Sequence, residues 1–378
     1  MLRFLRPFLA WLLVGAFPLA ACAQMLTPPP IAAKAFVLVD LLSGQTLAAA
    51  AQNDRFQPGS LTKLMTAYVV FAAMRDGKLD PNATVAIAES ATKAGGARMF
   101  VTVGSAVRVD DLLRGMIVQS ANDATLALAQ AVAGSEAAFV ERMNREAQRL
   151  GLAGTHYANA TGEPMKDHEV TARDVALLAA ALVRDFPDQY ARFSQKEFTY
   201  NGMTQSNRNR LLWTDPAVDG LQTSFTEASG YGLAASARRG ERRLVSVVVG
   251  AQSDGLRTSE TQKLLNFGFQ AYDTRRVFRK GEPVSEPRIY KGTQPTVKLG
   301  FDHDVWLSLP RDRFTGLSGL IQMRQPFVAP LAAGEKAGIM KVTRDNATVA
   351  EYPVVALEDV PVAGFLSRGW DTLKLLFR

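Results

Sequence analysis

A serine and a lysine lie three residues apart in the segment PGSLTKLM, as Ser60 and Lys63. At this spacing on a helix both side chains share one face. A serine hydroxyl is a poor nucleophile until a neighbouring base takes its proton, and a lysine among apolar neighbours can be that base because burial lowers its pKa. The pair therefore predicts acyl transfer through Ser60, although the same spacing also occurs by chance.

A second candidate group follows in the segment QSANDA, as Ser120 and Asn122. A serine in a turn between two helices can relay a proton, and an asparagine amide can hold both a lysine head and a substrate carbonyl. Serine and asparagine also form turns and helix caps, so this segment alone has a structural alternative.

The third candidate is the triplet Gln222, Thr223 and Ser224, which we expect on a short strand just where a loop begins. The order S-x-x-K, S-x-N and then a triplet related to K-T-G is typical of penicillin-binding proteins and class A β-lactamases. Each motif is weak alone, but the three in this order make a strong prediction of one serine acyl-transfer site.

On these motifs the chain resembles the low-molecular-mass penicillin-binding proteins that act as serine-type D-alanyl-D-alanine carboxypeptidases. The likeness covers nearly the whole chain and includes LLRGMIVQSANDATLALAQAVAG, TARDVALLAAALVRDFP and VDGLQTSFTEASGYGLAASA. It implies an α/β (α+β) domain of the transpeptidase/β-lactamase type, with an antiparallel sheet between helices. A small C-terminal all-β domain and a terminal amphipathic helix would follow.

The resemblance also implies the residue roles. Ser60 would attack the carbonyl between the last two D-alanines of a peptidoglycan stem peptide, with Lys63 as base. Ser120 and Asn122 would assist proton transfer and positioning, and the triplet would bind substrate. β-Lactam antibiotics would acylate the same serine, and neither a metal nor a cofactor is needed.

The triplet departs from the family pattern. The usual Lys-Thr-Gly reads Gln222-Thr223-Ser224, so a cation that would attract the substrate carboxylate is replaced by a neutral amide, and Ser224 adds a side chain where glycine allows close approach. Glu163 stands where an apolar residue is usual. An active carboxypeptidase is therefore weighed against a degenerate member that only binds peptidoglycan or a cell-wall partner, and against a β-lactam-hydrolysing enzyme.

The remaining pattern predicts the elements that position these groups. Residues 30–275 are expected to form the catalytic domain, with a strand pair over 35–49, helices beginning after Ser60, Ser135 and Thr171, and a closing helix from Arg257. Residues 276–359 carry short alternating strands divided by Gly and Pro, which predicts the β-rich domain. In residues 360–378 the apolar side chains fall on one helical face, which favours a tail in the membrane interface over a helix docked on the protein.

The N-terminus predicts export. Residues 1–23 contain two arginines, an apolar run and small residues, which is typical of a signal peptide cleaved after Ala23, although Cys22 also fits a lipoprotein site. Cys22 is the only cysteine, so no disulfide supports the fold. We expect a periplasmic protein associated with the inner membrane. The formal net charge of +7 is too diffuse to indicate nucleic-acid binding.

Overall fold

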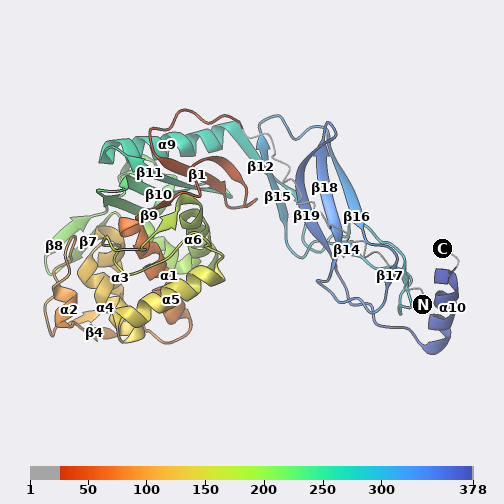
Figure 1. The fold of residues 1–378 in the computed structure, drawn as a ribbon, viewed down its shortest axis with the longest axis horizontal. Coiled ribbons are helices and arrows are strands. Elements are labelled where there is room, and N and C mark those ends of the chain that lie inside the picture. The colour runs from red at the N-terminus through yellow and green to blue at the C-terminus, as the bar shows by residue number, and fades with distance from the viewer. Residues whose placement is uncertain (1–25, 377–378) are drawn as a thin grey trace, which may run out of the picture. The chain divides into compact units, whose positions relative to one another are not determined.

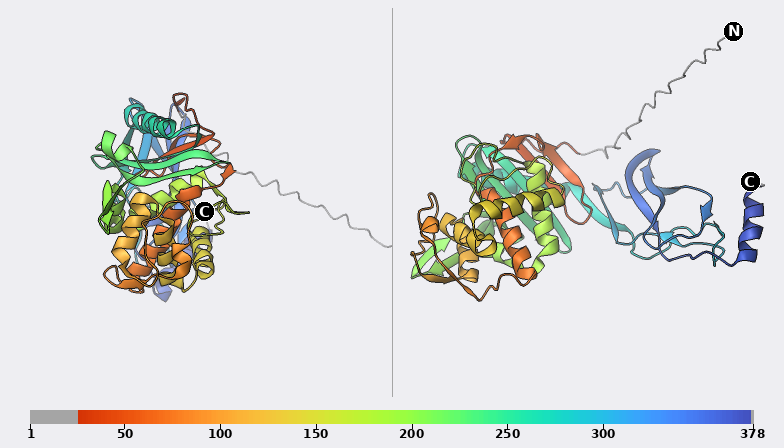
Figure 2. Two further views of the ribbon diagram at one scale, coloured as in Figure 1. Left: turned by 90° about the vertical axis from the view of Figure 1, so that its left-hand side faces the viewer. Right: turned by 60° about the horizontal axis from the view of Figure 1, so that its bottom comes forward.

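The computed structural model describes residues 26–376, so the predicted signal segment 1–23 with Cys22, and the tail residues Phe377 and Arg378, lie outside the described residues. The described chain forms two compact units. The larger unit contains residues 26–282 and 301–315, and the smaller contains residues 283–300 and 316–376. Figures 1 and 2 show the elements of each unit.

A five-stranded antiparallel sheet is the centre of the larger unit, in the order β2-β1-β11-β10-β9. Alternate side chains enter two different cores: Val37 and Val247 face one, whereas Leu38 and Val248 face the other. A sheet with both faces apolar must be covered on both sides. The strands are β1 Ala35–Asp40, β2 Thr46–Ala50, β9 Val218–Thr226, β10 Gly230–Arg239 and β11 Arg242–Ala251.

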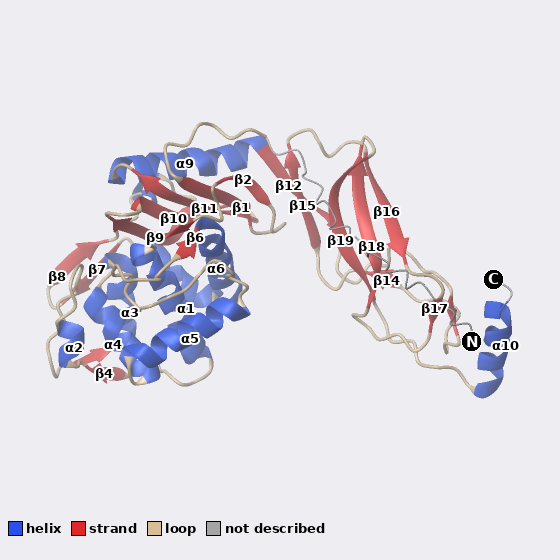
Figure 3. Cartoon of the chain, in the orientation of Figure 1, coloured by secondary structure: helices blue, strands red, loops and turns tan. Residues whose placement is uncertain are grey.

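Helices cover both faces of this sheet (Figure 3). α9, Asp254–Ala271, packs on one face, where Gly268 lets the helix approach Leu38 and Leu244 closely. On the other face, α1 Thr62–Arg75 and α6 Ala172–Asp185 contact the sheet. Further helices belong to the same layer: α4 Asn122–Ala133 and α5 Glu136–Arg149 pack with α1, and α3 Val109–Arg114 packs with α4. The family prediction of an antiparallel sheet between helices is thereby confirmed.

Shorter elements complete this unit. Helical turns occur at η1 Gly59–Leu61, α2 Glu89–Thr92, η2 Gly115–Gln119, α7 Pro187–Tyr190, η3 Ala191–Ser194 and α8 Leu211–Thr214. The paired short strands are β3 Arg55–Phe56 with β6 Val170–Thr171, β4 Thr84–Ala86 with β5 Ala106–Arg108, β7 Glu197–Tyr200 with β8 Met203–Ser206, and β12 Tyr272–Phe278 with β15 Val305–Pro310.

Side-chain caps set where α5, α6 and α9 begin. The Ser135 and Thr171 hydroxyls accept hydrogen bonds from Ala138 N and Asp174 N, so α5 and α6 begin where the sequence predicts. α9 begins earlier than the predicted Arg257, because Ser253 caps it. The expectation that a loop begins at the triplet was wrong: pairing of Phe225 with Tyr231 extends β9 past Ser224.

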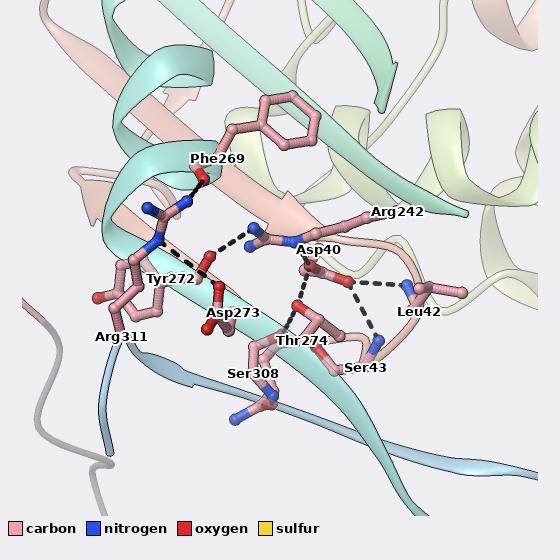
Figure 4. Close-up of polar contacts among 11 residues, drawn as sticks. Asp40, Leu42, Ser43, Arg242, Phe269, Tyr272, Asp273, Thr274, Ser308 and Arg311 are labelled. Carbon is pink, nitrogen blue, oxygen red and sulfur yellow. Dashed lines mark hydrogen bonds and ion pairs between the residues drawn. The ribbon is translucent and has the colours of Figure 1, made fainter. Parts of the chain in front are cut away.

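A buried carboxylate ties the sheet to the β12–β15 pair (Figure 4). Asp40 is fully buried at the end of β1 and accepts hydrogen bonds from Arg242 Nε and Thr274 Oγ1, both at 2.6 Å. Its other oxygen accepts from the backbone N–H groups of Leu42 and Ser43. Every lone-pair direction of this buried charge is therefore used, which is the condition for its burial to be tolerated.

The smaller unit is built on a four-stranded antiparallel sheet in the order β14-β19-β18-β16. The strands of this sheet are β14 Leu299–Gly300, β16 Leu317–Met323, β18 Lys336–Arg344 and β19 Ala347–Ala356. A separate pair consists of β13 Ile289–Tyr290 and β17 Phe327–Val328. β13 and β17 pair in parallel beside α10, Phe365–Leu376. This confirms the prediction of an all-β unit followed by a terminal helix.

The terminal helix is tethered to its own unit by polar contacts. Lys291 N donates to Asp371 Oδ2 at 2.7 Å, and Ala363 N donates to Lys291 O. Phe365 and Trp370 nevertheless remain 82% and 61% exposed. Among residues 26–376, no helix combines the length and apolarity needed to cross a bilayer.

Candidate active site

Ser60 and Lys63 meet at the start of α1. Ser60 lies in the η1 turn, and the Lys63 Nζ atom is 3.4 Å from the Ser60 Oγ atom and 2.6 Å from the Thr161 carbonyl oxygen. The Lys63 side chain is only 2% exposed, and this desolvation lowers its pKa to about 7. The positive charge of Arg208 lowers this pKa further, whereas Glu163 opposes the shift. A half-neutral lysine beside a serine hydroxyl is suited to act as its base.

Ser120 lies in the bend between η2 and α4, and Asn122 begins α4. Ser120 adopts a left-handed backbone conformation, and its buried hydroxyl has no hydrogen-bond partner within the described part of the chain. Asn122 is the first residue of α4 rather than part of the turn, and its amide donates to Gly95 O at 2.9 Å. An unpaired buried hydroxyl is free to bond to a substrate atom.

Asp123 holds the loop next to this bend, a role that sequence reasoning missed. Its buried carboxylate accepts hydrogen bonds from the backbone N–H groups of Met99, Phe100 and Val101 at 2.8–3.2 Å. The loop that contains Gly95 is thereby fixed against α4. Asp123 thus positions the loop to which Asn122 is bonded.

Two residues of the triplet line a cleft with Ser60. Thr223, Ser224 and Ser60 belong to the wall of this cleft, whose volume is about 710 Å³. Gln222 is buried, does not line the cleft, and makes no side-chain hydrogen bond to the residues that the structure describes. A Cβ atom on Gly232 would lie 2.6 Å from Ser224 Oγ, so the Ser224 hydroxyl projects over the bare backbone of β10.

Arg208 brings a positive charge to the wall of the cleft. Arg208 lines the cleft, is exposed, and makes no hydrogen bond or ion pair with any described residue. Asn207 and Asn209, the buried neighbours of Arg208, brace the loop: Asn207 Oδ1 accepts from Asn209 N, and Asn209 Oδ1 accepts from Leu211 N. Because buried asparagines alternate with exposed arginines along this loop, the Arg208 side chain faces outward. The segment SNRNR shows this alternation in the sequence, but the sequence alone does not predict that the loop lies at the cleft.

Arg257 also lines the cleft but is already engaged. Its Nη1 atom donates to Ser224 O at 2.7 Å, and it forms an ion pair with Asp254. Burial lowers its pKa from the ordinary arginine value. Arg257 therefore holds the end of β9 in place, whereas Arg208 keeps its donors for a ligand.

The turn around Asn159 brings two further residues to the site. Asn159 Oδ1 accepts from Gly162 N at 2.7 Å, and the Thr161 carbonyl in the same turn holds Lys63. Glu163 Oε1 lies 3.5 Å from Asn122 Nδ2. The structure thus joins the Lys63 and Asn122 parts of the predicted site through one turn.

Comparison with known proteins decides the family. The sequence family described as D-alanyl-D-alanine carboxypeptidase matches residues 22–253. The chain belongs to this family. The family described as penicillin-binding protein 5, C-terminal domain, matches residues 272–362. The prediction of a serine-type D-alanyl-D-alanine carboxypeptidase with a β-rich C-terminal domain is confirmed.

Relatives of this carboxypeptidase family match both units. D-alanyl-D-alanine carboxypeptidase DacC of Escherichia coli K12 is 36% identical over 100% of this chain and 96% of its own length. The crystal structure of penicillin binding protein 5 from Haemophilus influenzae is 37% identical, with a TM-score of 0.86 over 89% of this chain and 99% of that chain. Penicillin-Binding Protein D2 from Listeria monocytogenes, in its ampicillin-bound form, is 28% identical, with a TM-score of 0.60 over 65% of this chain and 100% of that chain. These likenesses favour a carboxypeptidase over a binding-only member of the family.

Proposed function

We propose that this carboxypeptidase removes the terminal D-alanine from peptidoglycan stem peptides through an acyl-enzyme on Ser60. The observation that carries the proposal is the buried Lys63, whose pKa is lowered to about 7, at 3.4 Å from Ser60 Oγ in a chain of this family. The relative solved in an ampicillin-bound form supports binding of β-lactams, which we expect to acylate Ser60.

In the first half-reaction, neutral Lys63 accepts the Ser60 proton as Oγ attacks the carbonyl between the two D-alanines. Backbone N–H groups at Ser60 and on β9 would stabilise the oxyanion. The Ser120 hydroxyl, unpaired within the described part of the chain, would pass the proton toward the leaving amine, and Asn122 would hold the acyl side of the substrate. Water then releases the shortened peptide and free Ser60.

Two assays on the purified chain test this function. A fluorescent penicillin should form a covalent adduct that survives denaturing electrophoresis, and a peptide ending in D-Ala-D-Ala should release D-alanine. Adduct formation without D-alanine release would contradict the proposed carboxypeptidase activity but support acylation of the chain. Absence of both signals would contradict an enzymatic function.

We further propose that Arg208 attracts the substrate's terminal carboxylate in place of the missing triplet lysine. A guanidinium that is already oriented toward the cleft can bind a carboxylate with two parallel hydrogen bonds. Three observations support this: Arg208 lines the same cleft as Thr223 and Ser224, it forms no ion pair with the described residues, and its charge lowers the pKa of Lys63. The neutral Gln222 then need not carry the charge.

Acylation should rise with pH to a midpoint near 7, because Lys63 acts only in its neutral form. Below that midpoint the rate should fall about tenfold per pH unit.

Arg208→Gln removes a positive charge that lowers the pKa of Lys63, so the midpoint of acylation should move to higher pH. The value of kcat/KM for the peptide should also fall about tenfold, because a charge-assisted contact with the substrate carboxylate is lost. Stopped-flow penicillin labelling across pH and D-alanine release measure the two effects.

Arg210→Gln is the matched control, since Arg210 lines the same cleft but is paired with Asp254 at 2.8 Å. It should leave both the midpoint and kcat/KM within about twofold of the parent, as expected for a side chain whose charge is already paired. If Arg208→Gln and Arg210→Gln have the same pH midpoint and the same kcat/KM, the proposed role of Arg208 is wrong.

We also propose that the chain is exported to the periplasm and rests on the inner membrane through its tail. The signal-like pattern of residues 1–23 and the exposed Phe365 and Trp370 of α10 support this. Lys374 lies 5.4 Å from the Trp370 ring, which places a cation at the edge of the apolar surface.

Replacing Phe365 and Trp370 by serine should release the chain from anionic lipid vesicles, because each aromatic ring contributes a large apolar area to interfacial binding. Vesicle co-sedimentation measures the bound fraction, which should fall several-fold while penicillin labelling is unchanged. Val328→Ser, at another exposed apolar residue of the same unit, is the control.

The intact mass of the chain from cells distinguishes cleavage after Ala23 from lipidation at Cys22.

A further inference from the structure

Glu163 brings a carboxylate to the active site. Its Oε1 atom lies 3.5 Å from Asn122 Nδ2, and a Cβ atom on Gly95 would lie 3.1 Å from that same oxygen. The side chain is exposed and forms no ion pair with the described residues. Its negative charge acts on Lys63. A carboxylate without a cationic partner keeps most of its lone pairs for other donors.

The backbone around Glu163 is held in place. Asn159 Nδ2 donates to Glu163 O at 2.8 Å, and Glu163 N donates to Thr161 Oγ1 at 3.3 Å. The same turn holds Lys63 through the Thr161 carbonyl. These bonds fix the Glu163 backbone relative to Lys63, the base of the first half-reaction, and a catalytic group needs a defined position of this kind.

Hydrolysis of the acyl-enzyme needs a proton acceptor for water. Once Ser60 is esterified, its Oγ has no proton to give, and the attacking water must lose one instead. A carboxylate beside Asn122, the residue proposed to hold the acyl group, can accept this proton.

Resting on the proposed function, we infer that Glu163 is the general base of the hydrolytic half-reaction, and that it gives this chain turnover of penicillins as well as of peptides. The water oxygen attacks the ester carbonyl carbon while Glu163 accepts one water proton. The tetrahedral intermediate collapses, the bond from the carbonyl carbon to Ser60 Oγ breaks, and the proton returns to Oγ. Ester and water thus become a carboxylic acid and free Ser60.

The test separates the two half-reactions in wild type and Glu163→Gln, using a fluorescent penicillin on the purified chain. Glutamine has the same shape and keeps an oxygen that can accept from Asn122, but it is not a base. The acyl-enzyme should live about 100-fold longer in the variant, in the usual range for loss of a general base. Acylation should not slow, because removal of the negative charge lowers the Lys63 pKa.

Glu169→Gln is the matched control. It makes the same change on a half-buried carboxylate of the same segment, one that lies 3.6 Å from Arg55. Its acyl-enzyme should have the wild-type lifetime, and penicillin hydrolysis under steady-state conditions should fall only in Glu163→Gln.

Three results would overturn the inference. An unchanged lifetime in Glu163→Gln excludes a base. If the rates of acylation and hydrolysis fall equally in Glu163→Gln, Glu163 is a positioning residue. If acylation by an amine-bearing stem peptide slows while the lifetime of the penicillin acyl-enzyme is unchanged, Glu163 is a substrate-binding residue. Failure of the wild type to form any adduct is a different result, which removes the proposed function itself.

Discussion

Replacing Ser60 with alanine should abolish the penicillin adduct and lower D-alanine release by at least about 10⁴-fold, since loss of a nucleophile removes the covalent route altogether. The cleft wall has two other serines, and no hydrogen bond to a described lysine is made by either: the Ser206 hydroxyl is 3.4 Å from Glu197, and the Ser224 hydroxyl projects over the β10 backbone. The measurements are adduct mass by intact-protein mass spectrometry and D-alanine release by a coupled oxidase assay.

Ser206→Ala provides the control for Ser60→Ala, because it removes a hydroxyl from the same cleft wall without touching the Ser60–Lys63 pair. It should keep both activities within about twofold, as expected for an exposed side chain. A penicillin adduct that persists in Ser60→Ala would place the nucleophile elsewhere. The melting temperature of Ser60→Ala should stay near that of the parent, because the lost side chain is only half-buried.

The local parts of this site could be predicted from the sequence. Ser60 and Lys63 belong to one helical turn, so their spacing alone brings them together. The Ser135 and Thr171 caps are also local, because a capping hydroxyl bonds to a backbone group three residues on. Contacts of this kind depend on short-range geometry, which residue types and periodicity describe well.

The contacts between distant segments could not be predicted. Glu163 meets Asn122, which lies on a different element, and Arg208 reaches the cleft from a loop braced by buried asparagines. Such positions depend on how loops pack, and loops carry no periodic pattern. The triplet illustrates the same limit: the sequence placed it on a strand just where a loop would begin, but pairing with β10 continues the strand past Ser224.

Substitution of Gly162 should have the second large effect on acylation, and the reason is a steric one that no sequence motif shows. It has φ of +91°, and the Cβ atom of an alanine there would overlap the Gly59 carbonyl oxygen and lie 2.9 Å from Thr62 Oγ1. Backbone cannot move aside as a flexible side chain can. The overlap would push on Gly59, the residue immediately before Ser60, and on the first turn of α1.

Gly162→Ala should therefore slow penicillin acylation by about 100-fold or more, because a shift of about 1 Å in a reacting group costs that much. Gly151→Ala separates this effect from backbone preference: Gly151 also has a positive φ, +71°, but no atom lies within 4 Å of an added Cβ. It should cost about 1–2 kcal/mol of stability and leave acylation unchanged. Acylation by Gly162→Ala within a few fold of the parent would mean that the turn around Asn159 can move without moving Ser60, and that the nucleophile does not depend on this contact.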